Sequence, residues 1–158
     1  MTGNSILPNI VIRPFNISDR ERLIHIFRLN TPTYFDSNEE KDFMEYLDKH
    51  GDTYFVVERE NVIVGGGGYH FTDRNTIGRI SWDMFHPESR GCGFGKQLVA
   101  HCLNKLRSEP SVKMLSVWTS QHANNFYGKF GFELKEIRKD YWGPGLDLYR
   151  MEMDVGHS

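Results

Sequence analysis

Three glycines at alternate positions stand between a segment with strand character and a segment with helical periodicity. Residues 89–99 read SRGCGFGKQLV, with Gly91, Gly93 and Gly95 immediately before the apolar positions of the periodic segment. Residues 78–85 (GRISWDMF) precede this loop and have the composition of a strand. A glycine-rich turn between a strand and a helix lets backbone N–H groups converge on an anion, and the helix dipole strengthens the attraction. The junction therefore predicts an α/β fold with a phosphate-bearing ligand at the start of this helix.

The rest of the chain divides into short strands and short helices. We expect strands at residues 9–15, 53–58, 78–85, 113–118, 132–137 and 147–153, with a further strand that starts at residue 62. Helices are expected after the capping boxes Ser18–Glu21 and Ser37–Glu40, from the glycine loop to Pro110, and at residues 120–129. The run Gly65–Gly68 fits either a strand with a bulge or a close backbone approach, or a flexible loop. Without a repeat or linker, this order predicts one α/β domain (α+β by some schemes) over residues 1–158.

The bulk properties exclude several classes of function. The chain has 158 residues, of which 39% are hydrophobic and 25% charged, and its net charge is -2. This balance argues against a nucleic-acid partner, because non-specific binding needs a strong positive excess. No apolar run is long enough to span a membrane, and residues 1–15 lack the pattern of a secretory signal. Cys92 and Cys102 give neither a disulfide framework nor a metal cluster, so we expect a cytoplasmic protein without a metal.

The spacing within the loop distinguishes between phosphate ligands. A nucleoside-triphosphate loop needs four residues between its first glycine and Gly-Lys-Ser/Thr. Here only three residues separate Gly91 from Gly95, and Gln97 stands where the metal-binding hydroxyl should be. The dinucleotide fingerprint G-x-G-x-x-G also fails, because these glycines read G-x-G-x-G and lie past the middle of the chain. What remains is Arg90-x-x-Gly93-x-Gly95, which can bind a pyrophosphate without a metal.

Two motifs together resemble the GCN5-related N-acetyltransferase (GNAT) superfamily. Residues 85–95 (FHPESRGCGFG) match its acyl-CoA loop, which reads Arg/Gln-x-x-Gly-x-Gly/Ala after a strand ending in hydrophobic-x-Pro. Residues 123–132 (ANNFYGKFGF) match its A-x-x-x-Tyr-x-x-x-Gly-Phe signature, and the order of elements over about residues 10–154 is similar as well. The resemblance implies a GNAT fold. This is a central mixed, mostly antiparallel, seven-stranded sheet, flanked by about four helices and splayed between strands 4 and 5.

The resemblance also implies direct transfer of an acetyl group from acetyl-CoA to an amine, without a metal. Tyr127 holds the position of the family's general acid, whose phenol protonates the thiolate leaving group. Several members carry a glutamate on the strand before the second motif, but residues 114–118 contain no carboxylate. Ser120 stands where an asparagine is common. The remaining candidates for the general base are Asp83, His86 and Glu88, and of these we expect Asp83 to be catalytic.

By the same resemblance, the coenzyme is expected along the loop and between the two splayed strands. The expected cofactor-binding residues are Met84, Phe85, Arg90, Gly91, Cys92, Gly93, Phe94, Gly95, Lys96, Ser120, Asn124 and Tyr127. Two aromatic loops face the thioester in this fold. They give the expected substrate-binding residues Tyr34, Phe35, Asp36, Tyr141 and Trp142.

The leading hypothesis is an acyl-CoA-dependent N-acetyltransferase that acts on a primary amine, either on a small molecule or at a peptide or protein N-terminus. Residues 141–151 resemble the ending of protein N-terminal acetyltransferases within the superfamily. The alternative is a catalytically weak CoA-binding sensor or partner module, which the missing glutamate and Ser120 keep open. Since members of the family often dimerise, the resemblance also leaves a homodimer open.

Overall fold

The computed structural model describes residues 9–156, and the main helices and strands follow one another in the expected order. They are β1 (Ile10–Pro14), α1 (Arg20–Leu29), α2 (Glu40–His50), β2 (Tyr54–Arg59), β3 (Val62–Thr72), β4 (Ile77–Phe85), α3 (Phe94–Arg107), β5 (Met114–Thr119), α4 (Asn124–Gly128), β6 (Glu133–Gly143) and β7 (Leu146–Asp154). Short 3₁₀ turns lie at η2 (Ile17–Asp19), η3 (Ser37–Glu39), η4 (Gly51–Thr53) and η5 (Pro87–Ser89). Residues 1–8, on which part of the secretory-signal argument rests, and residues 157–158 lie outside the described part.

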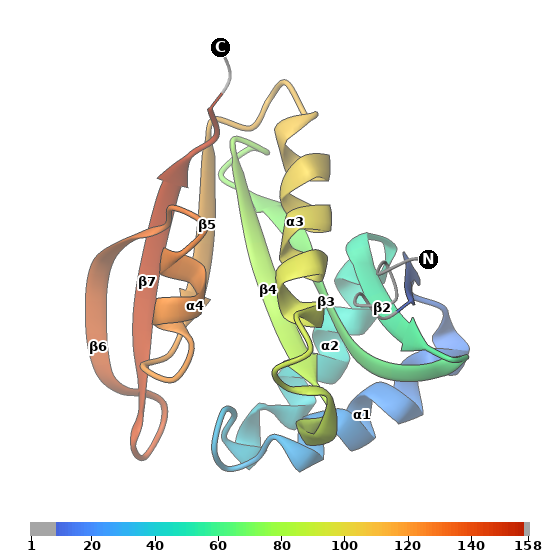
Figure 1. Ribbon diagram of the computed structural model, residues 1–158. Coiled ribbons are helices and arrows are strands. Elements are labelled where there is room, and N and C mark those ends of the chain that lie inside the picture. Colours follow the sequence, from blue (N-terminus) through green and yellow to red (C-terminus); the bar gives the residue numbers. More distant parts are fainter. Residues whose placement is uncertain (1–8, 157–158) are drawn as a thin grey trace.

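The seven strands form one sheet in the order β1-β2-β3-β4-β5-β7-β6. Every neighbouring pair is antiparallel except β4 and β5, whose parallel register covers only Ile77–Ile80 against Met114–Val117. Beyond Ile80 the two strands diverge, as Figure 1 shows. The prediction of a mostly antiparallel, seven-stranded sheet splayed between strands 4 and 5 is confirmed.

Helices cover both faces of the sheet and give two apolar cores. On one face, α3 and α4 bury side chains such as Leu98 and Leu106 against the strands. On the other face, α1 and α2 bury Phe27 and Phe43, which pack with Trp82 of β4. Within residues 9–156, no helix has both the length and the apolarity to cross a membrane.

The four consecutive glycines belong to β3, so the flexible-loop alternative is wrong; they lie in a strand and oppose a bulge of the neighbouring strand β4. In the pairing with β4, Gly66 lies opposite Met84 and Gly68 opposite Ser81, so Gly67 alone faces two residues. This bulge includes Trp82, whose φ is 57°. A Cβ atom on Gly67 would collide with the carboxylate of Asp83, the other bulged residue. The glycine run therefore makes room for a side chain of the neighbouring strand.

Both predicted capping boxes are wrong by one or two residues. The N-cap residues are Asn16 and Asp36, and each box is completed by the carboxylate three residues later, Asp19 or Glu39. Each cap begins a 3₁₀ turn that leads into the α-helix, and this places the N-cap upstream of Ser18 or Ser37. The predicted helix at residues 120–129 is shorter, because residues 121–123 form a turn before α4.

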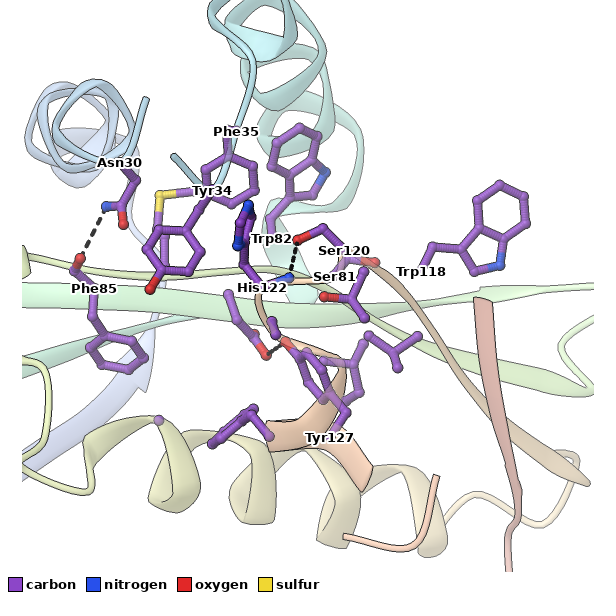
Figure 2. A pocket seen from close by; sticks show the side chains of 18 of the residues that line it. Asn30, Tyr34, Phe35, Ser81, Trp82, Phe85, Trp118, Ser120, His122 and Tyr127 are labelled. Atoms are coloured by element: carbon purple, nitrogen blue, oxygen red, sulfur yellow. Dashed lines mark hydrogen bonds between the residues drawn. The ribbon is translucent and has the colours of Figure 1, made fainter. Parts of the chain in front are cut away.

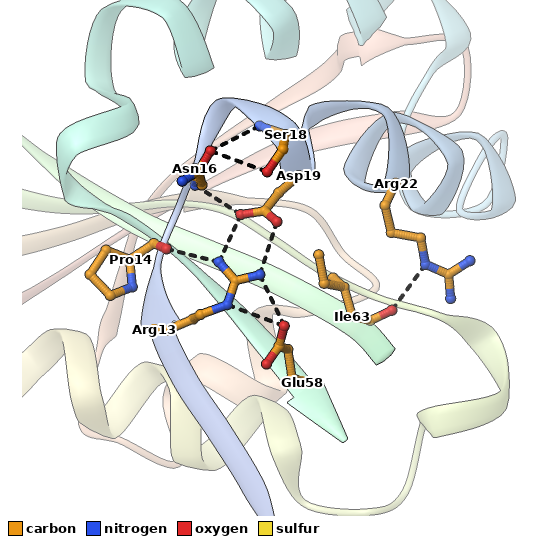
Figure 3. A network of polar contacts seen from close by, with 8 residues as sticks. All are labelled: Arg13, Pro14, Asn16, Ser18, Asp19, Arg22, Glu58 and Ile63. Carbon is orange, nitrogen blue, oxygen red and sulfur yellow. Dashed lines mark hydrogen bonds and ion pairs between the residues drawn. The ribbon is translucent and has the colours of Figure 1, made fainter. Parts of the chain in front are cut away.

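A polar network fixes the start of α1 against the edge of the sheet (Figure 3). The guanidinium of Arg13 on β1 donates two 2.9 Å hydrogen bonds to Asp19 and also binds Glu58 on β2. The hydrogen bonds from Arg13 hold the pKa of the buried Asp19 carboxyl below its usual range. The network orients α1, whose end carries a residue of the cavity described next.

Candidate active site

A cavity of about 710 Å³ opens where β4 and β5 separate. Its walls come from the end of α1 and the loop after it, from β4, from the glycine loop with the start of α3, and from the segment between β5 and α4. In Figure 2, Tyr34, Phe35 and Trp82 lie on one side of the strands and Tyr127 on the other. The cavity is therefore lined from both helical layers.

The start of α3 presents backbone N–H groups to this cavity. Gly91 and Gly93 both have φ of +82°, a left-handed conformation that glycine adopts without strain. Gly93 is the N-cap, and no side chain caps the first turn of this 14-residue helix. Its first N–H groups therefore remain available to an anion, and the helix dipole favours one there. The site fits a pyrophosphate, with Lys96 in the first turn of the helix.

The arginine of the loop is held in place by a residue that the sequence analysis missed. The guanidinium of Arg90 donates to Asn30 Oδ1 and lies 4.4 Å from the centre of the Tyr34 ring. Asn30 Nδ2 in turn donates to the carbonyl oxygen of Ile26 at 2.8 Å. It also donates to the carbonyl oxygen of Phe85 at 3.0 Å (Figure 2). Asn30 thus joins the end of α1, the end of β4 and the glycine loop at one wall of the cavity.

Tyr127 and Asp83 form a direct pair on the α3 side of the sheet. The Tyr127 hydroxyl donates a 2.6 Å hydrogen bond to Asp83 Oδ2 (Figure 2). Part of Asp83 faces the cavity, but its Oδ1 is enclosed and has no hydrogen-bond partner among the described residues. The pair exists because the β4 bulge turns Asp83 toward α4 and because Gly67 leaves the space that its carboxylate fills.

The environment of Asp83 favours its neutral form. Burial raises the pKa of this carboxyl to about 7, and the hydrogen bond from Tyr127 opposes the shift only in part. Burial and the carboxyl group of Asp83 raise the pKa of the Tyr127 phenol well above its ordinary value. The other titratable groups that interact with Asp83 are Tyr46, Tyr54 and Cys102, and none of them is a cation. Near pH 7 the Asp83 carboxyl can therefore accept a proton or give one up.

Aromatic side chains and one buried carboxyl form the opposite wall. Phe35 stacks on Trp82 at 5.6 Å, and Trp142 is held by a 3.1 Å hydrogen bond from its indole N–H to the carbonyl of Thr119. Glu39 is buried, and its carboxylate accepts the backbone N–H of Asp36 at 2.9 Å. Burial raises the pKa of Glu39 to about 7. This wall can bind an apolar or cationic group and contains a carboxyl group that titrates near neutral pH.

Most of the expected site residues line the cavity. Those that do are Tyr34, Phe35, Asp83, Met84, Phe85, Arg90, Gly91, Gly93, Phe94, Gly95, Lys96, Ser120, Tyr127 and Trp142. Cys92, Asn124, Asp36 and Tyr141 do not. Asp36 does not line it because its carboxylate caps η3, and Cys92 packs against the α3 core. Of the other base candidates, His86 accepts the N–H of Glu88 as the N-cap of η5, and Glu88 is exposed.

The cavity also contains polar residues that the sequence analysis did not select. They are Asn30, Glu39, Tyr46, His70, Arg79, Ser81, Ser89, Thr119 and His122. Side chains alternate along β4, so Arg79 and Ser81 share the face opposite Ile80, which packs in the core on the α3 side. This alternation could have identified Arg79 and Ser81 as neighbours on one face of the sheet. No motif marked Asn30 or Glu39. In the described part of the chain, no group of three or more His, Cys, Asp and Glu side chains could hold a metal ion.

Comparison with known proteins identifies the fold and the family. The model of the acetyltransferase (GNAT) family matches residues 21–132. An N-alpha-acetyltransferase of Sulfolobus acidocaldarius is 25% identical over 169 aligned positions, which cover 90% of this chain and 91% of that protein. Ard1 from Thermoplasma volcanium superimposes with a TM-score of 0.79 at 19% identity, covering 94% of this chain and 99% of that one. The structure of yncA from Salmonella typhimurium with its cofactor acetyl-CoA superimposes with a TM-score of 0.72 at 18% identity, covering 95% of this chain and 96% of that one.

The family match includes both β4 with its glycine loop and the segment that carries Tyr127. It spans most of the described chain, and the sheet order agrees with it. The chain belongs to the acetyltransferase (GNAT) family and is an N-acetyltransferase.

Proposed function

We propose that this chain transfers the acetyl group of acetyl-CoA to a primary amine, on a small molecule or at a peptide or protein N-terminus, by direct attack. One observation carries the proposal. The uncapped start of α3 and the Tyr127 hydroxyl open into the same cavity, so a pyrophosphate site and an acid serve one space. We also propose residues 1–158 as one domain that acts in the cytoplasm, where Cys92 and Cys102 stay free thiols.

Acetyl-CoA, when bound, supplies the acetyl thioester, and the chain's own residues bind and orient it. The N–H groups that follow Gly91 and Gly93 receive the pyrophosphate, with Lys96 adding positive charge. Arg90 is fixed toward the cavity by Asn30 and Tyr34. Residues 81–85 of β4 have no strand partner on the β5 side, so backbone groups there are free to orient the rest of the ligand.

Tyr127 is proposed to donate its hydroxyl proton to the departing thiolate sulfur. When Asp83 is ionised, its Oδ2 accepts that same proton and Tyr127 has none to offer. When Asp83 is protonated, it can donate to the phenol oxygen, and the Tyr127 hydroxyl is then free to point into the cavity. As Tyr127 gives up its proton, the Asp83 proton moves to the phenol oxygen. In this arrangement Asp83 supports the acid, which replaces the base role assigned to it in the sequence analysis.

The acceptor amine is proposed to lie at the aromatic wall and to lose its proton through Glu39 or a water on it. Glu39 lines the cavity, and its pKa of about 7 suits a base that works at neutral pH. An N-terminal α-amine, with a pKa of about 7.7–8.0, needs less help than a lysine-like amine with a pKa of about 10.4. The N-alpha-acetyltransferase relative supports the first of these acceptors.

The test is a panel of small amines and short peptides with free N-termini, assayed for CoA release and for the acetylated product by mass spectrometry. We expect at least one acceptor to raise CoA release above background hydrolysis, and Tyr127→Phe to lower kcat by roughly 100-fold or more. Tyr141→Phe is the matched control, because Tyr141 is exposed and does not line the cavity. If no amine is acetylated while CoA still protects the chain in thermal melts, the alternative of a CoA-binding module is the better description.

A further inference from the structure

Arg79 is a cation without an anion in the acceptor side of the cavity. It lies on β4, lines the cavity and is half-buried. Its Nε is enclosed and has no hydrogen-bond partner among the described residues. Burial lowers the pKa of its guanidinium, whereas the ion-paired Arg13 has a raised pKa. A partly desolvated guanidinium without a partner is costly, so this residue is expected to have a ligand.

The guanidinium leans toward the open end of the β4–β5 pair. In the parallel register Arg79 lies opposite Ser116, yet its guanidinium lies 4.3 Å from the centre of the Trp118 ring, two residues further along β5. That position is level with Ser81, the last residue before the bulge. Asp83 follows two residues later, or about 7 Å along a strand. The cation therefore lies within one short molecule of the Tyr127–Asp83 pair.

The groups around Arg79 do not neutralise it. Glu152 acts on it at longer range but is paired with Arg150 at 2.5 Å, and Arg150 adds a repulsive charge. His70 lies opposite Arg79 on β3, and burial lowers its pKa to about 4, so it is neutral at pH 7. Among the described residues, Tyr46 and Tyr141 are the other titratable groups that act on Arg79, and burial raises the pKa of the Tyr46 phenol, so that it stays neutral at pH 7.

The neighbouring polar side chains can complete a small anion site. Ser81 Oγ and Tyr46 OH lie 3.0 and 3.2 Å from His70 Nδ1, and all three residues line the cavity with Arg79. The planar guanidinium donates in a fork that matches a carboxylate, and its contact with the Trp118 ring restricts where that fork can lie. The fork and the nearby hydroxyls are suited to a planar anion.

We propose that Arg79 binds a carboxylate carried by the acceptor, close to the amine that is acetylated. This inference rests on the proposed function and names its substrate class, an amine that also bears a carboxylate. That carboxylate belongs either to the side chain of a first Glu or Asp residue or to the α-carboxylate of a small amino acid. The distance along β4 favours a carboxylate a few bonds away from the amine.

The test compares acceptors that differ only in charge. One arm uses C-terminally amidated peptides that begin with Glu or with Gln, and the other uses free alanine and alaninamide. A charged hydrogen bond of this kind corresponds to roughly a 10- to 100-fold higher kcat/KM for the carboxylate member of at least one arm. The arm that shows the difference identifies the source of the carboxylate.

Arg79→Gln is expected to abolish that preference while the neutral acceptor keeps its kcat/KM within a few-fold. Arg74→Gln is the matched control, because Arg74 is exposed on the β3–β4 turn and does not line the cavity. A thermal melt of each variant establishes that it is folded. Equal kcat/KM for both members of each arm in the wild type, or a preference that survives Arg79→Gln, overturns the inference.

A binding measurement separates this inference from the proposed function. If no acceptor of either charge is acetylated, the proposed function fails, and calorimetric titration of the same peptides and amino acids in the presence of CoA tests the subsite alone. Binding of the carboxylate member by the wild type and not by Arg79→Gln supports the carboxylate site. Equal binding by both proteins, or no binding at all, overturns it.

Discussion

Replacing Asp83 by Asn tests the pair at the centre of the site. Asp83→Asn removes the titratable group but keeps its shape, and the amide can donate permanently to the Tyr127 oxygen. Burial raises the pKa of Asp83 to about 7, whereas an exposed aspartate titrates near 3.9. The difference of about 3 pH units corresponds to about 4 kcal/mol, an upper value because water in the cavity screens part of it.

The sign of the effect on stability follows from proton binding. Below about pH 4 the carboxyl is protonated in both the folded and the unfolded chain, and its raised pKa then makes its full contribution to the free energy of unfolding. Between about pH 4 and pH 7 the folded chain binds more protons than the unfolded chain, so the free energy of unfolding decreases as pH rises. Asp83→Asn lacks this contribution. The free energy of unfolding should therefore decrease by up to about 4 kcal/mol more in the wild type than in the variant over that range.

Urea unfolding at pH 4, 5, 6, 7 and 8 measures this difference, and comparing the pH dependence of the two proteins removes the contribution of Glu39, which is present in both. The same pair should control the rate. Since ionised Asp83 holds the Tyr127 proton, kcat of the wild type should decrease about tenfold per pH unit above pH 7, and Asp83→Asn should lose this decrease. If the free energy of unfolding of the wild type and of Asp83→Asn depends on pH in the same way, the reasoning is refuted. The same holds if kcat of the variant decreases above pH 7 as it does in the wild type. The relay itself predicts a lower kcat of the variant at every pH, because an amide cannot pass a proton to the phenol oxygen, so the readout is the pH dependence of kcat and not its size.

Four further substitutions test other parts of the structure. Gly93→Ala forces a side chain onto a residue with φ of +82° and should raise the Kd for CoA at least several-fold by calorimetry, with little change in acceptor KM. Gly67→Ala should destabilise the fold by about 2 kcal/mol or more in urea unfolding, because its Cβ meets the Asp83 carboxylate. Glu39→Gln keeps an oxygen for the Asp36 N–H, so its melting temperature should hold while kcat/KM for a lysine-like amine decreases 10- to 100-fold. Asp19→Asn should cost about 2–4 kcal/mol at pH 7 and less at pH 3, because the lowered pKa of Asp19 adds stability that is lost as the carboxyl becomes protonated.

The parts of the site that could be predicted are those encoded locally. Turns that need a left-handed residue usually carry a glycine there, so the spacing of Gly91 and Gly93 predicts the anion-binding loop without knowledge of the fold. Tyr127 was found because its motif spans only ten residues of one turn and helix. The splay between strands 4 and 5 followed from the resemblance, and its physical basis is the short parallel register that ends at Ile80.

The parts that could not be predicted depend on contacts between distant segments. Asn30 is an ordinary helix-terminal residue in the sequence, and only the packing of α1 beside the end of β4 brings it to Arg90. In the sequence Glu39 is one more polar residue near a helix start, and its burial is a property of the folded chain that no local pattern encodes. Asp36, which was expected at the substrate, is used by the chain itself to begin η3.

The bulge in β4 explains how one strand serves both sides of the reaction. In a regular strand Ser81 and Asp83 would share a face and Trp82 would point the other way. Here Ser81 contacts His70 and Trp82 packs on Phe27, so two consecutive side chains lie on the α1–α2 face, and Asp83 turns to Tyr127 on the other. One inserted residue thus supplies an aromatic wall for the acceptor and a carboxyl group for the acid. Gly67 leaves the space that this inversion needs, so the position of the Asp83 carboxyl depends on a glycine of the neighbouring strand as well as on β4 itself.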